Sequence, residues 1–168
     1  MRALPHAALL PHVAGVGGVS GVIDAVRDLD VDVILALGGT DTSVLGALPP
    51  NVRTVGWIPL SALVPTCSAI VHHGGAGTTM NALVAGVRQL VLPHIADQHG
   101  NARAVQQRGV GLMHLPEEAD AEVVRRSLRQ LLEDSNFTQA AQEVRQENET
   151  QIPPAEIVPL LVELVRRG

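Results

Sequence analysis

The 168-residue sequence contains no lysine and no tyrosine, and it has only one tryptophan, one phenylalanine and one cysteine. A single cysteine, Cys67, excludes a disulfide framework and any metal site built from several thiolates. Because aromatic residues are so scarce, the core has to be built from alanine, valine, leucine and isoleucine; apolar residues make up 46% of the chain. All 12 basic residues are arginine, and the net charge of −5 argues against nucleic-acid binding through a broad basic surface.

Long hydrophobic runs are also missing. The longest apolar runs, such as residues 31–37, are short and interrupted, so that no transmembrane helix or signal peptide is visible. We therefore expect a cytoplasmic protein of one domain, or one part of a larger assembly. The composition leaves room for a pocket that holds a single small anion.

Short apolar runs alternate with longer amphipathic segments. Runs typical of buried strands lie at residues 31–37, 52–57, 68–72, 89–92 and 109–113. Helical periodicity marks residues 20–29, 78–85 and 98–108, and then, without further strands, 121–132, 137–144 and 157–165. This alternation predicts an α/β fold with a doubly wound parallel sheet, followed by a helical tail over residues 119–168.

The first 18 residues fit this pattern less well. They contain Pro5, Pro11 and several glycines, whereas a doubly wound domain normally begins with an uninterrupted strand and a glycine turn. We expect a poorly formed start over residues 1–18, with a strand within residues 7–13 that Pro11 interrupts.

The most informative segment runs from the end of a predicted strand into a helix, with the sequence His-His-Gly-Gly-Ala-Gly-Thr-Thr over residues 72–79. Its glycines let the backbone approach a ligand, and the N–H groups of the following helix form a phosphate site. Thr78 and Thr79 can add hydroxyl donors, and His73 can donate to a diphosphate oxygen. The segment is neither a P-loop nor the dinucleotide fingerprint. The alternative is a turn whose glycines serve packing alone.

Four elements carry a family resemblance when they are taken together: the turn at residues 73–78, Pro93, the pair Asp97-Gln98, and Trp57-Ile58-Pro59 before the turn. They resemble the donor-binding signature of GT-B glycosyltransferases. The nearest similarity is to the bacterial natural-product branch, which glycosylates macrolides, polyketides and enediynes. The resemblance is strong over residues 18–115 and looser elsewhere.

The resemblance implies that the chain is a nucleotide-sugar-binding domain over residues 1–168. The implied donor contacts are to the diphosphate from His73, Gly75, Gly77 and Thr78, to the nucleobase from Trp57, and to the sugar from Asp97 and Gln98. General chemistry agrees with these roles, because a nucleobase stacks on a flat ring and sugar hydroxyls pair with carboxylates and amides.

Other roles are open for several of these residues. Trp57 could be a core aromatic residue, and Asp97 occupies the position of a helix N-cap. A metal site is suggested by three histidines that lie close in the sequence, His72, His94 and His99. The resemblance to GT-B enzymes implies that no metal is needed, so we expect neither metal nor cofactor.

Two positions depart from the related plant signature. Leu60 stands where the plant enzymes have glutamine, and Asn81 stands where they have glutamate. The resemblance therefore implies that base and ribose contacts differ here.

A GT-B enzyme has two doubly wound domains, and its catalytic base belongs to the first. Nothing in this sequence provides that base, so we expect the C-terminal, donor-binding half of a glycosyltransferase that uses a UDP- or TDP-sugar, inactive without an N-terminal acceptor domain or chain. The alternatives are a subunit of a split enzyme, a non-catalytic auxiliary or truncated remnant, and a nucleotide-sugar epimerase on the same fold.

Overall fold

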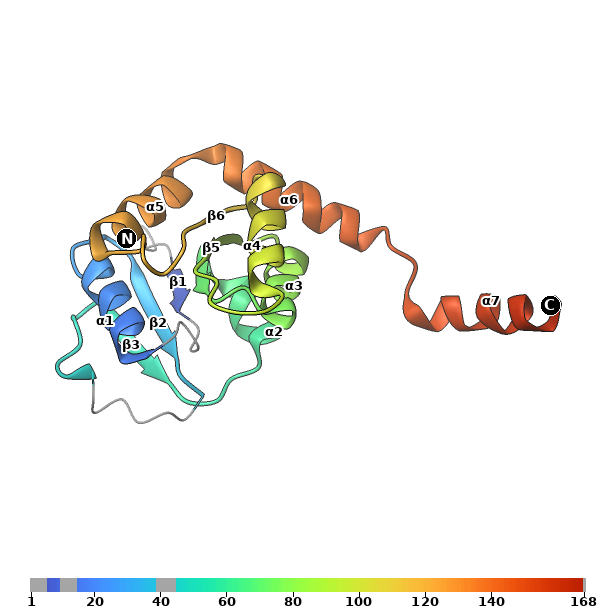
Figure 1. Cartoon of the computed structure of the whole chain (residues 1–168), viewed down its shortest axis with the longest axis horizontal. Coiled ribbons are helices and arrows are strands. Elements are labelled where there is room, and N and C mark those ends of the chain that lie inside the picture. The colour runs from blue at the N-terminus through green and yellow to red at the C-terminus, as the bar shows by residue number, and fades with distance from the viewer. Residues whose placement is uncertain (1–5, 10–14, 39–44, 168) are drawn as a thin grey trace.

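The computed structural model describes residues 6–9, 15–38 and 45–167, and it consists of a parallel sheet covered by helices (Figure 1). The strands are β1 (His6–Leu9), β2 (Asp32–Ala36), β3 (Val52–Val55), β4 (Ala69–His72), β5 (Arg88–Val91) and β6 (Gly111–Met113). The helices are α1 (Gly15–Val26), α2 (Leu60–Leu63), α3 (Ala76–Ala85), α4 (Gln98–Gln107), α5 (Ala121–Glu133), α6 (Ser135–Glu149) and α7 (Pro154–Arg167).

The strand order in the sheet is β3-β2-β1-β4-β5-β6, and every neighbouring pair is parallel. From β1 the chain winds outward through β2 and β3, then crosses back to β4 and winds outward the other way. The prediction of a doubly wound parallel sheet is therefore confirmed. In such sheets ligands bind at the carboxyl ends of the strands, where the winding direction changes.

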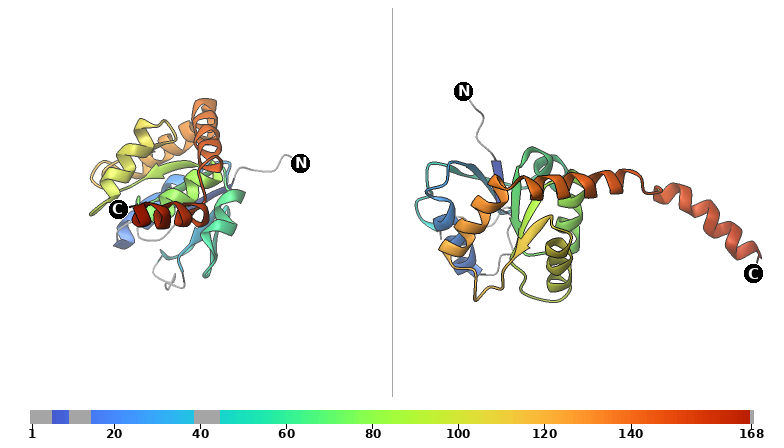
Figure 2. Two further views of the ribbon diagram at one scale, coloured as in Figure 1. Left: turned by 90° about the vertical axis from the view of Figure 1, so that its right-hand side faces the viewer. Right: turned by 90° about the horizontal axis from the view of Figure 1, so that it is seen from above.

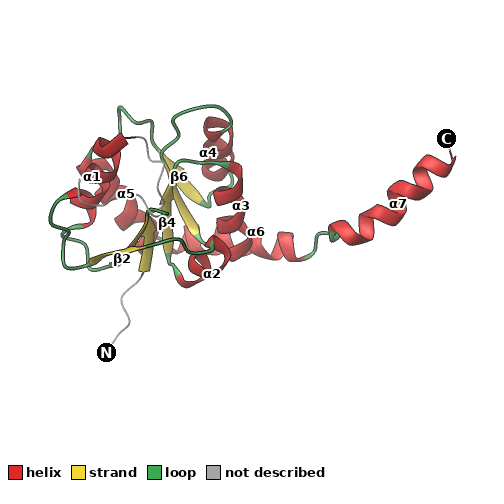
Figure 3. Ribbon diagram, turned by 90° about the horizontal axis from the view of Figure 1, so that it is seen from below, coloured by secondary structure: helices red, strands yellow, loops and turns green. Residues whose placement is uncertain are grey.

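Successive residues of the inner strands point to opposite faces of the sheet, and both faces are covered (Figure 3). Val71 and Leu90 pack in one cluster with residues of α1 and α5, whereas their neighbours Ile70 and Val91 pack towards α2, α3, α4 and α6. The buried strands are consequently aliphatic on both sides, which explains their continuous apolar runs.

The predicted elements recur with shifted ends. β1 overlaps the segment predicted as an interrupted strand but begins one residue earlier, at His6, and residues 10–14, which include Pro11, lie outside the described residues. Helix α1 begins at Gly15 rather than at residue 20. Helix α2 and a 3₁₀ turn at Val64–Thr66 were not predicted, because two prolines divide this stretch into pieces too short to show periodicity.

The helical tail is confirmed, but its last helix differs from the other two. Helices α5 and α6 pack on the body through buried residues such as Val124, Leu128 and Ala141. Helix α7 buries none of its side chains and extends away from the body (Figures 1 and 2). Among the described residues, no helix is both long and apolar enough to cross a bilayer.

Candidate functional site

The turn after β4 lies at the carboxyl edge of the sheet, next to the central strand. Gly74 adopts a φ of +89°, and a Cβ atom there would lie 2.8 Å from Cγ1 of Val91 and 3.0 Å from the backbone oxygen of Gln98. Glycine is therefore required at this position for both conformation and space. Helix α3 follows directly, with Gly75 as an N-cap that supplies no side-chain hydrogen bond. The first turn of α3 thus presents backbone donors and the positive end of the helix dipole.

His73 lies against this turn. Its Nδ1 accepts a hydrogen bond of 3.1 Å from the backbone N–H of Gly75, so that in the neutral ring the proton is on Nε2. Such an N–H can donate to a phosphate oxygen. Thr78 is half-buried at the start of α3, whereas Thr79 is buried and its hydroxyl donates to the backbone oxygen of Gly75. The expectation that Thr79 offers its hydroxyl to a ligand is therefore not met in this structure.

His72 has a different environment from its neighbour. It is fully buried, its Nδ1 accepts from the N–H of Gly74 at 3.0 Å, and its Nε2 lies 2.9 Å from Oε1 of Gln89. Since Nδ1 is an acceptor, the ring is neutral with its proton on Nε2. Burial lowers the pKa of His72 to about 4, so the ring stays neutral near pH 7. Both nitrogens are engaged within the protein, which rules out His72 as a metal ligand.

The loop between β5 and α4 carries Asp97 and Gln98. Asp97 stands at the N-cap position of α4 but makes no capping bond with its side chain, and its Oδ2 accepts from Nδ2 of Asn101 at 2.9 Å. Oε1 of Gln98 accepts from the backbone N–H groups of His94 (2.8 Å) and Ile95 (3.1 Å). The oxygen of Gln98 therefore holds the loop, and its Nε2 donor is the group suited to a sugar hydroxyl.

The loop and the turn are in direct contact. Nδ2 of Asn101 donates to the backbone oxygen of Gly74 at 2.9 Å, and the missing side chain of Gly74 leaves room for the backbone of Gln98. The structure thus brings together two of the predicted groups, the turn at residues 73–78 and the pair Asp97-Gln98.

Trp57 lies beyond the carboxyl end of β3, before α2. Its side chain is 80% exposed, so it is not a core residue. Because all strands are parallel, Trp57 lies at the same edge of the sheet as the turn. A common cleft for Trp57 and His73 stays a prediction.

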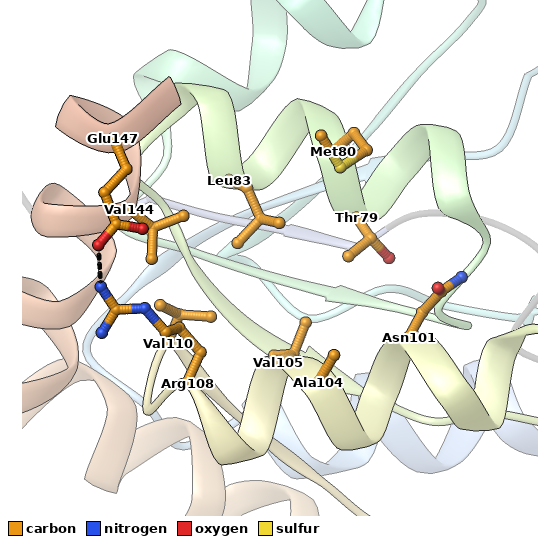
Figure 4. Close-up of a pocket in the computed structure, with 10 residues that line it drawn as sticks. All are labelled: Thr79, Met80, Leu83, Asn101, Ala104, Val105, Arg108, Val110, Val144 and Glu147. Atoms are coloured by element: carbon orange, nitrogen blue, oxygen red, sulfur yellow. Dashed lines mark hydrogen bonds and ion pairs between the residues drawn. The ribbon is translucent and has the colours of Figure 1, made fainter. Parts of the chain in front are cut away.

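A groove of about 320 Å³ runs beside the turn, between α3, α4 and α6 (Figure 4). Thr79 and Asn101 lie at one end of it, and an ion pair between Arg108 and Glu147 lies at the other. Its wall between these ends is mostly apolar, with Leu83 and Val105 among the lining residues. At the end of the groove nearest the turn, the lining residues Thr79 and Asn101 already form hydrogen bonds within the protein.

Two residues that shape the site were not among the predicted ones. The sequence spacing could have indicated Asn101, since Asn101 follows Asp97 by four residues on a helix and therefore lies on the same helix face as Asp97. For Gln89, a buried polar residue in the middle of β5, no sequence pattern indicated the contact with His72.

Within the described ranges, no three histidine, cysteine or acidic side chains gather as the ligands of a metal ion would. The expectation that neither metal nor cofactor takes part stays a prediction.

The strand order and the glycine turn at the head of α3 define a doubly wound domain of the kind found in GT-B glycosyltransferases, whose solved structures it resembles. The family described as the erythromycin biosynthesis protein CIII-like C-terminal domain matches residues 20–164, and the chain belongs to this family.

Individual relatives agree with this assignment. The elloramycin glycosyltransferase of Streptomyces olivaceus is 44% identical over 148 residues, which are 88% of this chain and 37% of that protein. The aklavinone 7-beta-L-rhodosaminyltransferase of Streptomyces galilaeus is 45% identical over 144 residues, covering 85% of this chain and 32% of that protein. The chain therefore spans about a third of the length of these curated relatives.

Solved structures are likewise matched over less than half of their length. The glycosyltransferase SnogD from Streptomyces nogalater matches with a TM-score of 0.79 and 40% identity, over 96% of this chain and 44% of that one. The glycosyltransferase VinC, solved in complex with dTDP, matches with a TM-score of 0.86 and 33% identity, over 98% of this chain and 42% of that one. The resemblance inferred from the sequence is thus confirmed, and the match lies in the C-terminal domain of the family.

Proposed function

We propose that this chain is the donor-binding half of a glycosyltransferase that moves a sugar from a nucleoside-diphosphate sugar to a hydroxyl group of a small-molecule acceptor. The observation that carries the proposal is the turn after β4, where a left-handed Gly74 leads into the uncapped start of α3 beside His73, an arrangement suited to an anion. The relatives with the same domain are named as glycosyltransferases.

In the proposed reaction, a base in the other half deprotonates the acceptor hydroxyl, whose oxygen then attacks the anomeric carbon. The bond from that carbon to the diphosphate oxygen breaks, and the configuration inverts. His73, Thr78 and the backbone N–H of Gly77 would meet the charge that grows on the leaving diphosphate. Gly75, whose own N–H donates to Nδ1 of His73, would let the diphosphate approach the backbone because it has no side chain. Asp97 and Gln98 would hold the sugar hydroxyls.

The donor base is either uracil or thymine, and we favour TDP because VinC was solved with dTDP. Trp57, which is exposed beyond β3, is the residue proposed to stack on the base. Stacking of this kind contributes roughly 1–3 kcal/mol. Because Trp57 is the only tryptophan, its fluorescence should report base binding directly.

The partner in the proposal is an N-terminal acceptor half, either on the same polypeptide or on another one. The match to VinC covers 98% of this chain but 42% of that one, so it includes helix α7, which has 14 residues. Exposed apolar side chains lie along α7, among them Leu161, Leu164 and Val165. Since α7 buries nothing against the domain, we propose that it packs on the acceptor half. A cytoplasmic location is part of the proposal and is compatible with a free, buried Cys67.

The test is calorimetric titration of the chain with TDP, UDP and ADP. We expect binding of TDP or UDP and a loss of about tenfold or more in affinity for His73→Ala, since a charge-assisted hydrogen bond contributes roughly 1.5–3 kcal/mol. His114→Ala is the matched control, because that ring pairs with Ser127 at 2.8 Å instead. Absence of heat with all three nucleotides would reject the donor site and favour a non-catalytic auxiliary.

A further inference from the structure

Gly74 is held by side chains at both its backbone N–H and its backbone oxygen. The N–H donates to Nδ1 of His72 at 3.0 Å, and the oxygen accepts from Nδ2 of Asn101 at 2.9 Å. His72 is anchored in turn by Gln89, at 2.9 Å in the buried interior. Two peptide groups that flank a left-handed glycine are thereby fixed in orientation, and these groups lead directly into the first turn of α3.

Asn101 uses its amide group twice. Nδ2 carries two protons, and it has two acceptors at 2.9 Å: the backbone oxygen of Gly74 and Oδ2 of Asp97. Asp97 makes no capping bond to α4, so Asn101 is the described partner that orients its carboxylate. A serine has one proton to donate and an aspartate has none when ionised, so neither residue could satisfy both acceptors in place of the amide.

We propose that Asn101 is a positioning residue that ties the diphosphate-binding turn to the sugar-binding carboxylate, and so sets the separation of the two donor subsites. The inference rests on the proposed function, because it assigns the turn to the diphosphate and Asp97 to the sugar. The bond that breaks in the reaction joins these two parts of the donor. One amide group therefore keeps both parts aligned across that bond.

The first test compares two probes, TDP and TDP-glucose, on the full chain by calorimetry. Asn101→Ala should lower the affinity for TDP by about threefold to tenfold, because the turn is loosened. It should lower the affinity for TDP-glucose by a further factor of about ten, because Asp97 is also released. In a chain that already carries Asp97→Ala, Asn101→Ala should lower the affinity for TDP-glucose only by the factor by which it lowers the affinity for TDP. The control Asn148→Ala removes an amide that also donates to a backbone oxygen at 2.9 Å, but within α6, and both affinities should stay unchanged.

The second test needs no nucleotide. By NMR, the backbone amide of Gly74 should exchange at least tenfold faster in Asn101→Ala than in the parent or in Asn148→Ala. In Asn101→Asp the protection factor of Gly74, which is the ratio of the intrinsic to the observed exchange rate at each pH, should be low at neutral pH. It should rise as the introduced carboxyl is protonated, because a protonated carboxyl again donates one hydrogen bond. A general structural defect would not reverse with pH.

The outcomes separate the two claims. If the parent chain binds neither TDP nor TDP-glucose, the donor function fails, while the exchange of Gly74 still decides whether Asn101 holds the turn. Unchanged exchange in Asn101→Ala overturns the positioning role. Equal losses for TDP and TDP-glucose, or losses that add in the double variant, overturn the link to Asp97.

Discussion

The turn after β4 depends on a few side chains with different tasks. Gly74 adopts a left-handed conformation, His72 and Asn101 bond to its backbone N–H and oxygen, and the imidazole of His73 is the one proposed to contact the diphosphate. Two adjacent histidines therefore have opposite roles, because the strand ends between them: His72 still points into the core, and His73 lies on the turn.

A substitution at Gly74 should destabilise the fold. Gly74→Ala combines a positive φ with contacts of 2.8 and 3.0 Å, and we expect it to lower the free energy of unfolding by about 1–3 kcal/mol. Urea denaturation measures the change. Gly100→Ala, in α4 with nothing within 4 Å of the added methyl group, should leave stability unchanged or raise it. Equal effects at the two positions would show that Gly74 is not constrained.

The neutral state of His72 should make stability depend on pH. Its pKa is 6.5 in the unfolded chain and about 4 in the fold, so only the unfolded chain takes up this proton between those values. The contribution of the neutral His72 ring to the free energy of unfolding is complete above pH 6.5 and is lost as the pH falls towards 4. It amounts to about 3 kcal/mol by linkage.

The measurement is urea denaturation at pH 7 and pH 5 for the parent and for His72→Gln. Burial also lowers the pKa of His94 and of His114, so the parent should lose stability at pH 5 through all three residues. The variant should lose less. An identical loss in both proteins would mean that His72 is protonated in the fold.

Among single residues, the sequence predicted the glycine turn but not the hydrogen bonds that hold it. The glycines and His73 were recognisable because a turn between a strand and a helix requires them. The buried Gln89 and the engaged hydroxyl of Thr79 were not, because hydrogen bonds between elements far apart in the chain leave no periodic pattern.

Among the helices and strands, the buried central ones were the easiest to predict. β2 and β4 are mostly aliphatic on both faces, and this produces the apolar runs in the sequence. The short α2 has only four residues, which are too few for a helical periodicity to be visible in the sequence. Helix α7 was predicted as a helix from its amphipathic pattern, but a pattern cannot show which surface receives the apolar face.

Helix α7 should contribute nothing to the stability of the isolated chain. Since none of its side chains is buried, removing residues 152–168 should leave the melting temperature within about 1–2 °C of the parent value. The same truncation should abolish association with a separately expressed N-terminal half of a related enzyme, measured by calorimetry.

A matched pair of point variants refines this test. Leu161→Glu places a charge on the exposed apolar side chains and should weaken association, whereas Glu163→Gln, on the same helix, should change it little. A large drop in melting temperature on truncation would instead show that α7 folds back onto its own domain.

At the scale of the whole molecule, the chain alone should not transfer a sugar. General-base catalysis needs a base within about 3 Å of the acceptor hydroxyl, and that base is proposed to lie in the other half. We expect no glycoside from a labelled nucleotide sugar and a panel of hydroxylated aglycones. Product should form only after an N-terminal half is added, and His73→Ala should abolish it. Product from the chain alone would overturn the half-enzyme proposal.

Binding of the donor should not need a metal ion. The proposed contacts are N–H and O–H groups together with the end of a helix, so excess EDTA should leave the affinity for TDP unchanged. A tenfold loss that Mg²⁺ restores would contradict this expectation.

The strand order has a consequence for how the chain can be shortened or divided. β1 is only four residues long, yet it is the sole strand that joins the pair β2–β3 to the trio β4–β6. A chain without residues 6–9 would lose the middle of its sheet rather than an edge, and two open strand edges would be left facing each other. Such edges recruit other chains. A fragment that lacks residues 6–9 is therefore expected to aggregate, whereas removal of residues 152–168 at the opposite end should leave the fold of the chain intact.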